Sequence, residues 1–95
     1  MFSNRTKTGR ANIVGYNIRR LRKSLKISQR ELADNLQNIG MKVDKNAIQR
    51  MESGRRFITD IDMFYIAKVF NVSIFDLYKT DDIPDEIILD LGNNG

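Results

Sequence analysis

The sequence predicts an all-α domain built from five helices, and three observations support this fold class. Apolar residues recur at spacings of three and four along most of the chain, which is the period of a helix face. Residues that cap helices stand just before several of these segments. No segment shows a sustained alternation of apolar and polar residues, so no strand is expected. With 95 residues, the chain has the length of one domain.

The first two predicted helices lie in the first half of the chain. A helix over residues 13–26 is predicted by apolar residues spaced four, three and four apart, namely Val14, Ile18, Leu21 and Leu25. The run from Ser28 to Glu31 has the pattern of a capping box, in which each side chain accepts a backbone N–H of the other residue. It starts a second helix that continues to Gln37 and is broken by Gly40.

Three further helices are predicted after this point. Asp44 is a good N-cap for a third helix, which turns Ile48 and Met51 inward and stops at Gly54. Residues 59–62 start a fourth helix. Its inward positions are Met63, Ile66, Ala67 and Phe70. Ser73 caps a fifth helix of one or two turns that contains Ile74, Leu77 and Tyr78.

The composition limits the chemistry that is open to this chain. It has no Cys and no His, so a disulfide, a thiolate metal site and a histidine base are excluded. We therefore expect no catalytic residues, no metal and no cofactor. The longest apolar run, residues 63–67, is too short to span a membrane, and the first residues lack the apolar core of a signal peptide. A cytoplasmic protein without a membrane partner is expected.

Charge is distributed unevenly along the chain. Residues 1–56 hold 14 of the 16 Lys and Arg residues and only four acidic residues, whereas residues 57–95 hold two basic and eight acidic residues. A basic half joined to an acidic half presents a surface suited to polyanions. The same pattern is also compatible with a solvated surface of uneven charge.

Residues 81–95 form an acidic and apolar tail in this prediction. The stretch from residue 87 to residue 91 is apolar enough to pack against a protein surface. It either covers its own domain or contacts a second copy or another protein, and periodicity over five residues does not decide between these.

Four motifs occur in a fixed order along the chain: IRRLR at residues 18–22, ISQRELA at 27–33, IQRMESG at 48–54 and IAKVFNVS at 66–73. Together they resemble the phage-repressor and Cro (XRE-type) helix-turn-helix family over residues 13–78. The resemblance implies a compact five-helix, repressor-like DNA-binding domain with the helix-turn-helix at the second and third helices. We therefore expect a basic N-terminal arm at 1–12, the DNA-binding domain at 13–80 and the tail at 81–95.

The connection between the second and third helices is about five residues longer than is common in this family. The added residues fall within 37–43, so the chain resembles the subset with a lengthened connection. Ile39, Met41 and Val43 are expected to pin this connection to the core, and Lys42 is placed to add a phosphate contact.

The resemblance also implies which residues contact DNA. The residues expected to reach base edges are Lys45, Asn46, Ala47, Gln49 and Arg50. Asn pairs well with adenine, Arg or Lys with guanine, and the Ala methyl group with the thymine methyl. The residues expected to contact phosphates are Gln29, Lys42, Ser53, Arg55 and Arg56. Arg22 and Glu52 are expected to form a structural ion pair between the first and third helices.

Upstream of the first helix, Arg5, Lys7 and Arg10 belong either to an arm that lies along DNA or to a disordered leader.

Two functions remain open at this stage. The first is a DNA-binding repressor that binds a pseudo-palindromic operator as a homodimer through the major groove of double-stranded DNA. Its interface candidates are Phe75, Tyr78, Ile87 and Leu91. The second is an interaction protein whose tail holds a protein partner, with DNA binding secondary.

Overall fold

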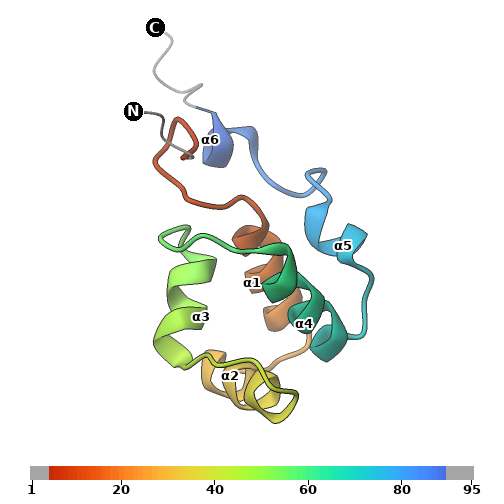
Figure 1. Ribbon diagram of the computed structural model, residues 1–95. Helices are drawn as coiled ribbons and strands as arrows, with labels where there is room; N and C mark the ends of the chain where they lie inside the picture. Colours follow the sequence, from red (N-terminus) through yellow and green to blue (C-terminus); the bar gives the residue numbers. More distant parts are fainter. Residues whose placement is uncertain (1–4, 90–95) are drawn as a thin grey trace, which may run out of the picture.

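The computed structural model describes residues 5–89, and six helices lie in this range (Figure 1). They are α1 (Val14–Ser24), α2 (Gln29–Asn38), α3 (Lys45–Glu52), α4 (Asp60–Phe70), α5 (Ile74–Tyr78) and α6 (Asp85–Ile88). The first five are the helices predicted from the sequence, and the described residues contain no strand. The sixth is a single turn inside the predicted tail.

Side-chain caps start four of these helices. Ser28 and Glu31 form the predicted capping box of α2, with N–H to oxygen distances of 3.0 and 2.9 Å. Thr59 with Asp62 and Ser73 with Asp76 make the same arrangement at α4 and α5, and Asp44 caps α3. These local bonds explain why the helix starts were readable from the sequence.

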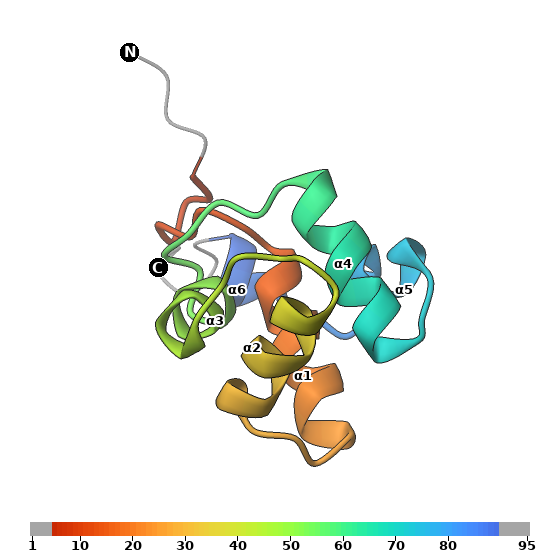
Figure 2. The same ribbon diagram turned by 60° about the horizontal axis from the view of Figure 1, so that its bottom comes forward.

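The core lies among the first five helices, where α1 packs on α3, α4 and α5, and α2 packs on α3 and α4. Figures 1 and 2 show α3 and α4 on opposite sides of α1, and α2 crosses below in Figure 1. Seven apolar side chains are completely buried here: Ile18, Leu32, Leu36, Ile48, Met51, Ile66 and Leu77. They come from α1 to α5, so each of these helices is fixed by burial of its apolar side.

The N-terminal segment packs on the domain in its described part. Ala11 and Asn12 are buried, and the Ala11 N–H donates to the Gly54 carbonyl at 2.6 Å. The Thr8 hydroxyl donates to the carbonyl of Ile87 in α6. Residues 10–12 are therefore part of the domain rather than a free arm or leader.

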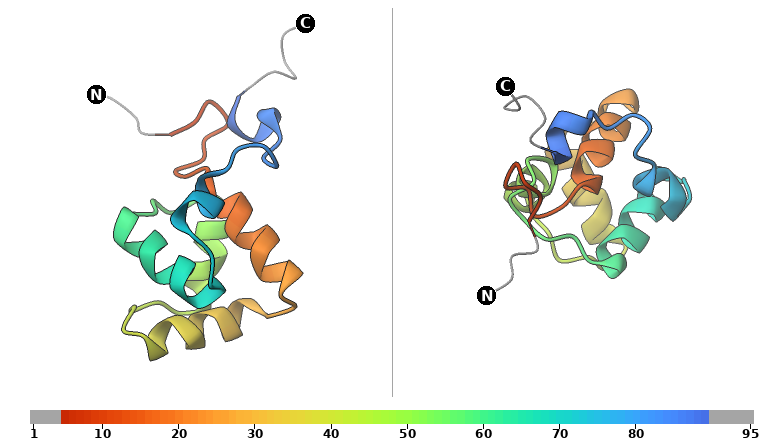
Figure 3. Two further views of the ribbon diagram at one scale, coloured as in Figure 1. Left: turned by 90° about the vertical axis from the view of Figure 1, so that its right-hand side faces the viewer. Right: turned by 90° about the horizontal axis from the view of Figure 1, so that it is seen from above.

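The C-terminal segment also covers its own domain as far as it is described. Ile83 is buried, Ile87 and Ile88 are half-buried, and Leu89 is exposed. Figure 3 shows α6 beside the N-terminal segment, at the end of the molecule opposite α2. Leu91, one of the predicted interface residues, lies outside the described residues.

Between residues 5 and 89, the longest helices are too short and too polar to cross a lipid bilayer.

Candidate nucleic-acid interface

Helix α3 turns one side into the core and the other to solvent. Asp44 starts it by accepting the Ala47 N–H at 2.8 Å, and Ile48, Met51 and Glu52 are buried. The exposed side chains of α3 and its C-cap form a polar strip, defined here as Lys45, Asn46, Gln49, Arg50 and Ser53. Their spacing of three and four places them on one side of the helix.

Ala47 does not belong to the polar strip. It is only 3% exposed and packs in the core with Ile48 and Met51. Its expected contact with a thymine methyl group does not fit this position, and we leave Ala47 out of the base-contacting residues. The buried side of α3 therefore includes Ala47 in addition to Ile48 and Met51, the two residues that the helical spacing predicted.

A buried ion pair fixes α3 to α1. Arg22 Nε donates to Glu52 Oε2 at 2.6 Å, and Arg22 Nη2 donates to Glu52 Oε1 at 3.0 Å. Hydrogen bonding to Glu52 raises the pKa of Arg22 and outweighs the effect of burial. Both residues are buried, which matches the structural role that the resemblance implies.

Gln29 extends this pair to α2. Its side-chain amide donates to Glu52 Oε1 at 3.1 Å, so part of the group expected to contact a phosphate is already used inside the protein. The bond joins the first residue of α2 to the last residue of α3. Three helices therefore meet at one carboxylate.

Asn12 holds the end of α3 from the other direction, and sequence reasoning missed it. Its side-chain amide donates to the carbonyls of Met51 and Arg56 at 3.0 and 2.7 Å. Its oxygen accepts the N–H of Gly15 in the first turn of α1 at 2.8 Å. One side chain thus joins the start of α1 to the end of α3. One feature of the sequence could have indicated a role for Asn12. It stands just ahead of the apolar pattern that predicts α1, which is the position typical of an N-cap residue.

Arg10 completes the contacts at this end of α3. Its Nη2 donates to the Glu52 carbonyl at 3.2 Å, and its Nε donates to the Asn12 carbonyl at 2.9 Å. Desolvation by burial lowers the pKa of Arg10. A cation among the last carbonyls of a helix is favourable, because those groups carry partial negative charge.

The predicted phosphate contacts come from several segments. Gln29 begins α2, Ser53 belongs to the polar strip as the C-cap of α3, and Arg55 and Arg56 follow α3. Ser53 and Arg55 are exposed, and Arg56 is half-buried. Within residues 5–89, the side chains of Arg55 and Arg56 have no hydrogen bond or ion pair that would occupy them.

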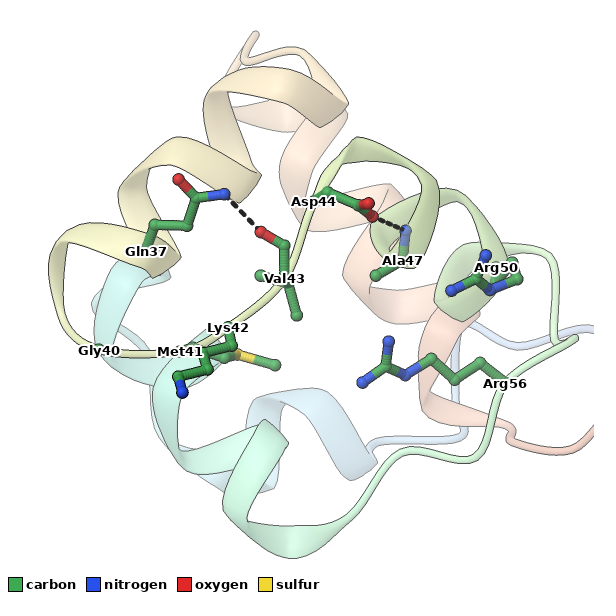
Figure 4. Close-up of a pocket in the computed structure, with 9 residues that line it drawn as sticks. All are labelled: Gln37, Gly40, Met41, Lys42, Val43, Asp44, Ala47, Arg50 and Arg56. Atoms are coloured by element: carbon green, nitrogen blue, oxygen red, sulfur yellow. Dashed lines mark hydrogen bonds between the residues drawn. The ribbon is translucent and has the colours of Figure 1, made fainter.

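The lengthened connection between α2 and α3 packs on the core at two points. Met41 and Val43 are buried, and the Gln37 amide donates to the Val43 carbonyl at 2.6 Å. Ile39 is 44% exposed, so its predicted role in pinning the connection is wrong. Between the connection and α3 lies an open hollow of about 670 Å³. Figure 4 shows its lining: Gln37, Gly40, Met41, Lys42, Val43, Asp44, Ala47, Arg50 and Arg56.

A comparison with protein-family models identifies the chain. A model described as "Helix-turn-helix" matches residues 18–77, which include α2, α3 and the connection between them. The chain belongs to the Cro/XRE-type helix-turn-helix family. This is the family predicted from the four sequence motifs. It is a family of DNA-binding transcription regulators and not a class of enzymes.

A solved helix-turn-helix structure has the same fold. It is the restriction-modification controller protein C.AhdI from Aeromonas hydrophila, with 22% sequence identity and a TM-score of 0.60. The match covers 67% of this chain and 86% of that one. No curated protein sequence matches the chain.

Within this helix-turn-helix fold, the polar strip of α3 is exposed to solvent. The strip lies on a helix held at its end by Glu52, Asn12 and Arg10. Such anchoring fixes the position of the helix that carries the strip.

Proposed function

We propose that the chain is a sequence-specific repressor that binds a pseudo-palindromic operator as a homodimer, with α3 in the major groove. The single observation that carries this proposal is the polar strip of α3. Within residues 5–89, the side chains of Lys45, Asn46 and Gln49 make no hydrogen bond, although the helix beneath them is tightly held. Free donors and acceptors on a rigid helix are what direct base readout requires.

The proposed base readers are Lys45, Asn46 and Gln49. Asn and Gln each present a donor and an acceptor that match the N6 and N7 atoms of adenine, and Lys donates to guanine O6 or N7. All three are exposed. Lys45 and Asn46 are the first two residues of α3, and Gln49 follows Lys45 by one helical turn. Arg50, which was also among the five predicted readers, lines the hollow as well.

The proposed phosphate contacts hold α3 in register without reading sequence. Gln29 stands at the start of α2, where backbone N–H groups are free, and Ser53 and Arg55 stand beyond α3. Each phosphate that a cation neutralises releases counterions, so Arg55 contributes to the salt-dependent part of the affinity, whereas Gln29 and Ser53 add neutral hydrogen bonds. A repressor of this kind acts in the cytoplasm, where its operator is.

The proposed dimer interface includes the outer side of α5. Phe75 and Tyr78 are 79% and 51% exposed, while Leu77 between them is buried in the core. Exposed aromatic rings are enriched in interfaces that bury them. A two-fold dimer also matches the symmetry of a pseudo-palindromic operator.

The dimer is tested by sedimentation velocity over a range of protein concentrations. Phe75→Ser is expected to shift the monomer–dimer equilibrium toward monomer by at least tenfold. Phe64→Ser is the matched control, because Phe64 is a half-exposed ring on α4 outside the proposed interface. Equal effects of the two substitutions would remove α5 from the interface.

Base reading is tested with duplexes selected by the wild-type protein. Asn46→Ala is expected to relax the preference at particular base pairs, because a bidentate pair discriminates by ~1–3 kcal/mol. Arg55→Ala is expected to weaken binding to all sequences alike and to lower the salt slope by about one. If Asn46→Ala leaves every base preference intact, α3 does not read sequence through this residue.

A further inference from the structure

The hollow beside α3 brings together cations from three parts of the chain. Arg50 comes from α3, Arg56 from the segment after it, and Lys42 from the lengthened connection. Figure 4 shows the guanidinium groups of Arg50 and Arg56 both pointing into the hollow, with Lys42 on the opposite rim. The connection, α3 and the segment after α3 therefore contribute to one basic site.

The two arginines have no acidic partner among the residues that the structure describes. The ion pairs found there join Arg20 with Asp82, Arg22 with Glu52 and Lys79 with Asp76. One carboxylate, Asp44, does line the hollow, but its Oδ1 accepts the Ala47 N–H as the N-cap of α3. Two guanidinium groups that share a hollow repel each other, and an anion placed between them removes this repulsion.

The position of the hollow indicates which anion it takes. Arg50 follows Asn46 by one helical turn, so the hollow opens along the edge of the polar strip. A duplex lying on the strip brings its sugar–phosphate backbone over this edge. Arginine matches a phosphate well, because its planar fork donates two parallel hydrogen bonds to the phosphate oxygens.

We propose that the hollow binds one backbone phosphate of DNA between Arg50 and Arg56, with Lys42 at its rim. This inference rests on the proposed DNA-binding function and changes it at one residue: Arg50 anchors the backbone and does not read a base. The lengthened connection has a function in this arrangement, because residues 40–43 form the wall that faces the two arginines.

The salt dependence of DNA binding tests the proposal. Two arginines that share one phosphate are expected to give non-additive effects. Because either arginine alone still neutralises the shared phosphate, Arg50→Ala and Arg56→Ala are each expected to change the slope of log K against log salt little, whereas the double variant loses about 0.9, the value for one phosphate. The matched control is Arg55→Ala, whose own phosphate costs about 0.9 in the single variant. Additive losses for Arg50 and Arg56 would overturn the shared site.

A second readout separates this proposal from the proposed function. Among duplexes selected by the wild-type protein, Arg50→Ala is expected to keep every base preference, whereas Asn46→Ala loses one. If Arg50→Ala relaxes a base preference while Asn46→Ala does so too, the chain reads DNA but the assignment of Arg50 to the backbone is wrong. If the wild type selects no sequence, the reading function fails, and the salt slopes still decide the phosphate site on any duplex.

The alternative to DNA as the ligand of this hollow is a free anion. Inorganic phosphate is used as the probe for this alternative. Thermal unfolding is measured without DNA, in phosphate and in chloride at equal ionic strength, for the wild type and the Arg50→Ala/Arg56→Ala variant. The DNA proposal predicts no more than a small difference between the two proteins. Stabilisation by phosphate that depends on both arginines, together with unchanged salt slopes for DNA, would assign the hollow to a free phosphate compound instead.

Discussion

Gly15 is placed where α1 touches the C-terminal end of α3. A Cβ atom built on it would lie 2.0 Å from the Met51 carbonyl oxygen and 2.6 Å from Asn12 Oδ1. The first neighbour is backbone, and the second is the side chain that joins α1 to α3. The absence of a side chain at residue 15 therefore allows α1 and α3 to approach this closely.

Gly15→Ala is expected to destabilise the fold by ~1–3 kcal/mol, as overpacking does. In an open helix the same change stabilises by about 1 kcal/mol, so the sign of the effect identifies the close approach. Urea unfolding measures it, with Asn35→Ala on the exposed side of α2 as the control. Unchanged or increased stability of Gly15→Ala would show that α1 and α3 do not meet this closely.

Glu52 is the partner that the buried Arg22 guanidinium needs. Glu52→Ala is expected to cost about 3 kcal/mol, because it leaves an uncompensated charge in the interior. Asp82→Ala, which breaks the exposed Arg20–Asp82 pair, is the control and is expected to cost less than ~1 kcal/mol. The loss of stability in each variant is measured from its urea unfolding midpoint, provided that the dependence of the unfolding free energy on urea concentration is unchanged. Similar costs for the two variants would contradict a structural role for Glu52.

At the scale of whole elements, the helix starts were predictable because their signals are local. The Ser28–Glu31 box and the Asp44 and Ser73 caps involve residues three apart, and each forms bonds with its own first turn. The inward positions of α4 followed from helical spacing in the same way, and Met63, Ile66 and Phe70 are buried.

The contacts that fix α3 were harder to predict because their partners are far away in sequence. Asn12 bonds to carbonyls 39 and 44 residues further along the chain, and Arg10 reaches the carbonyl of Glu52. The periodicity of the sequence does not predict such bonds, because they depend on how α1 and α3 pack against each other. The Arg22–Glu52 pair was expected only because of the family resemblance.

The cap of α5 gives a prediction for pH. Hydrogen bonds from the Ser73 N–H and hydroxyl, aided by Lys79, lower the pKa of Asp76. A carboxylate whose pKa is lower in the folded state stabilises the fold above its unfolded pKa of about 3.9 and loses this effect as pH falls through the folded value. The stability difference between wild type and Asp76→Asn is therefore expected to shrink on acidification below about pH 4.

Chemical unfolding at neutral and acidic pH measures this difference. Asp34→Asn, at an exposed position on α2, is the control for a general change in charge. A gap between wild type and Asp76→Asn that stays constant down to pH 2 would exclude the proposed cause.

At the scale of the whole molecule, the two halves of the chain have opposite charge. The basic half, residues 1–56, includes α1, α2 and α3, whereas the acidic half, residues 57–95, includes α4, α5 and α6. α6 lies at the end of the molecule opposite α2 (Figure 3). A polyanion is attracted to the helices of the basic half more than to those of the acidic half.

The uneven charge was visible in the sequence, whereas packing of the tail on its own domain was one of two alternatives there and packing of the N-terminal segment was not predicted. Ala11 and Ile83 are buried, although composition alone indicated an arm and a tail. Their burial depends on a surface that only the assembled helices provide. It leaves less apolar surface on the described tail for either a second copy or another protein.

The central claim, that α3 reads DNA sequence as part of a symmetric dimer, is tested most directly by selection from randomised duplex DNA. The wild-type protein is incubated with the pool at physiological salt, and the retained duplexes are sequenced. The account predicts an enriched pseudo-palindromic motif, with half-sites one helical turn of ~10 base pairs or a multiple of it apart. Uniform weak retention with no enriched motif would contradict it.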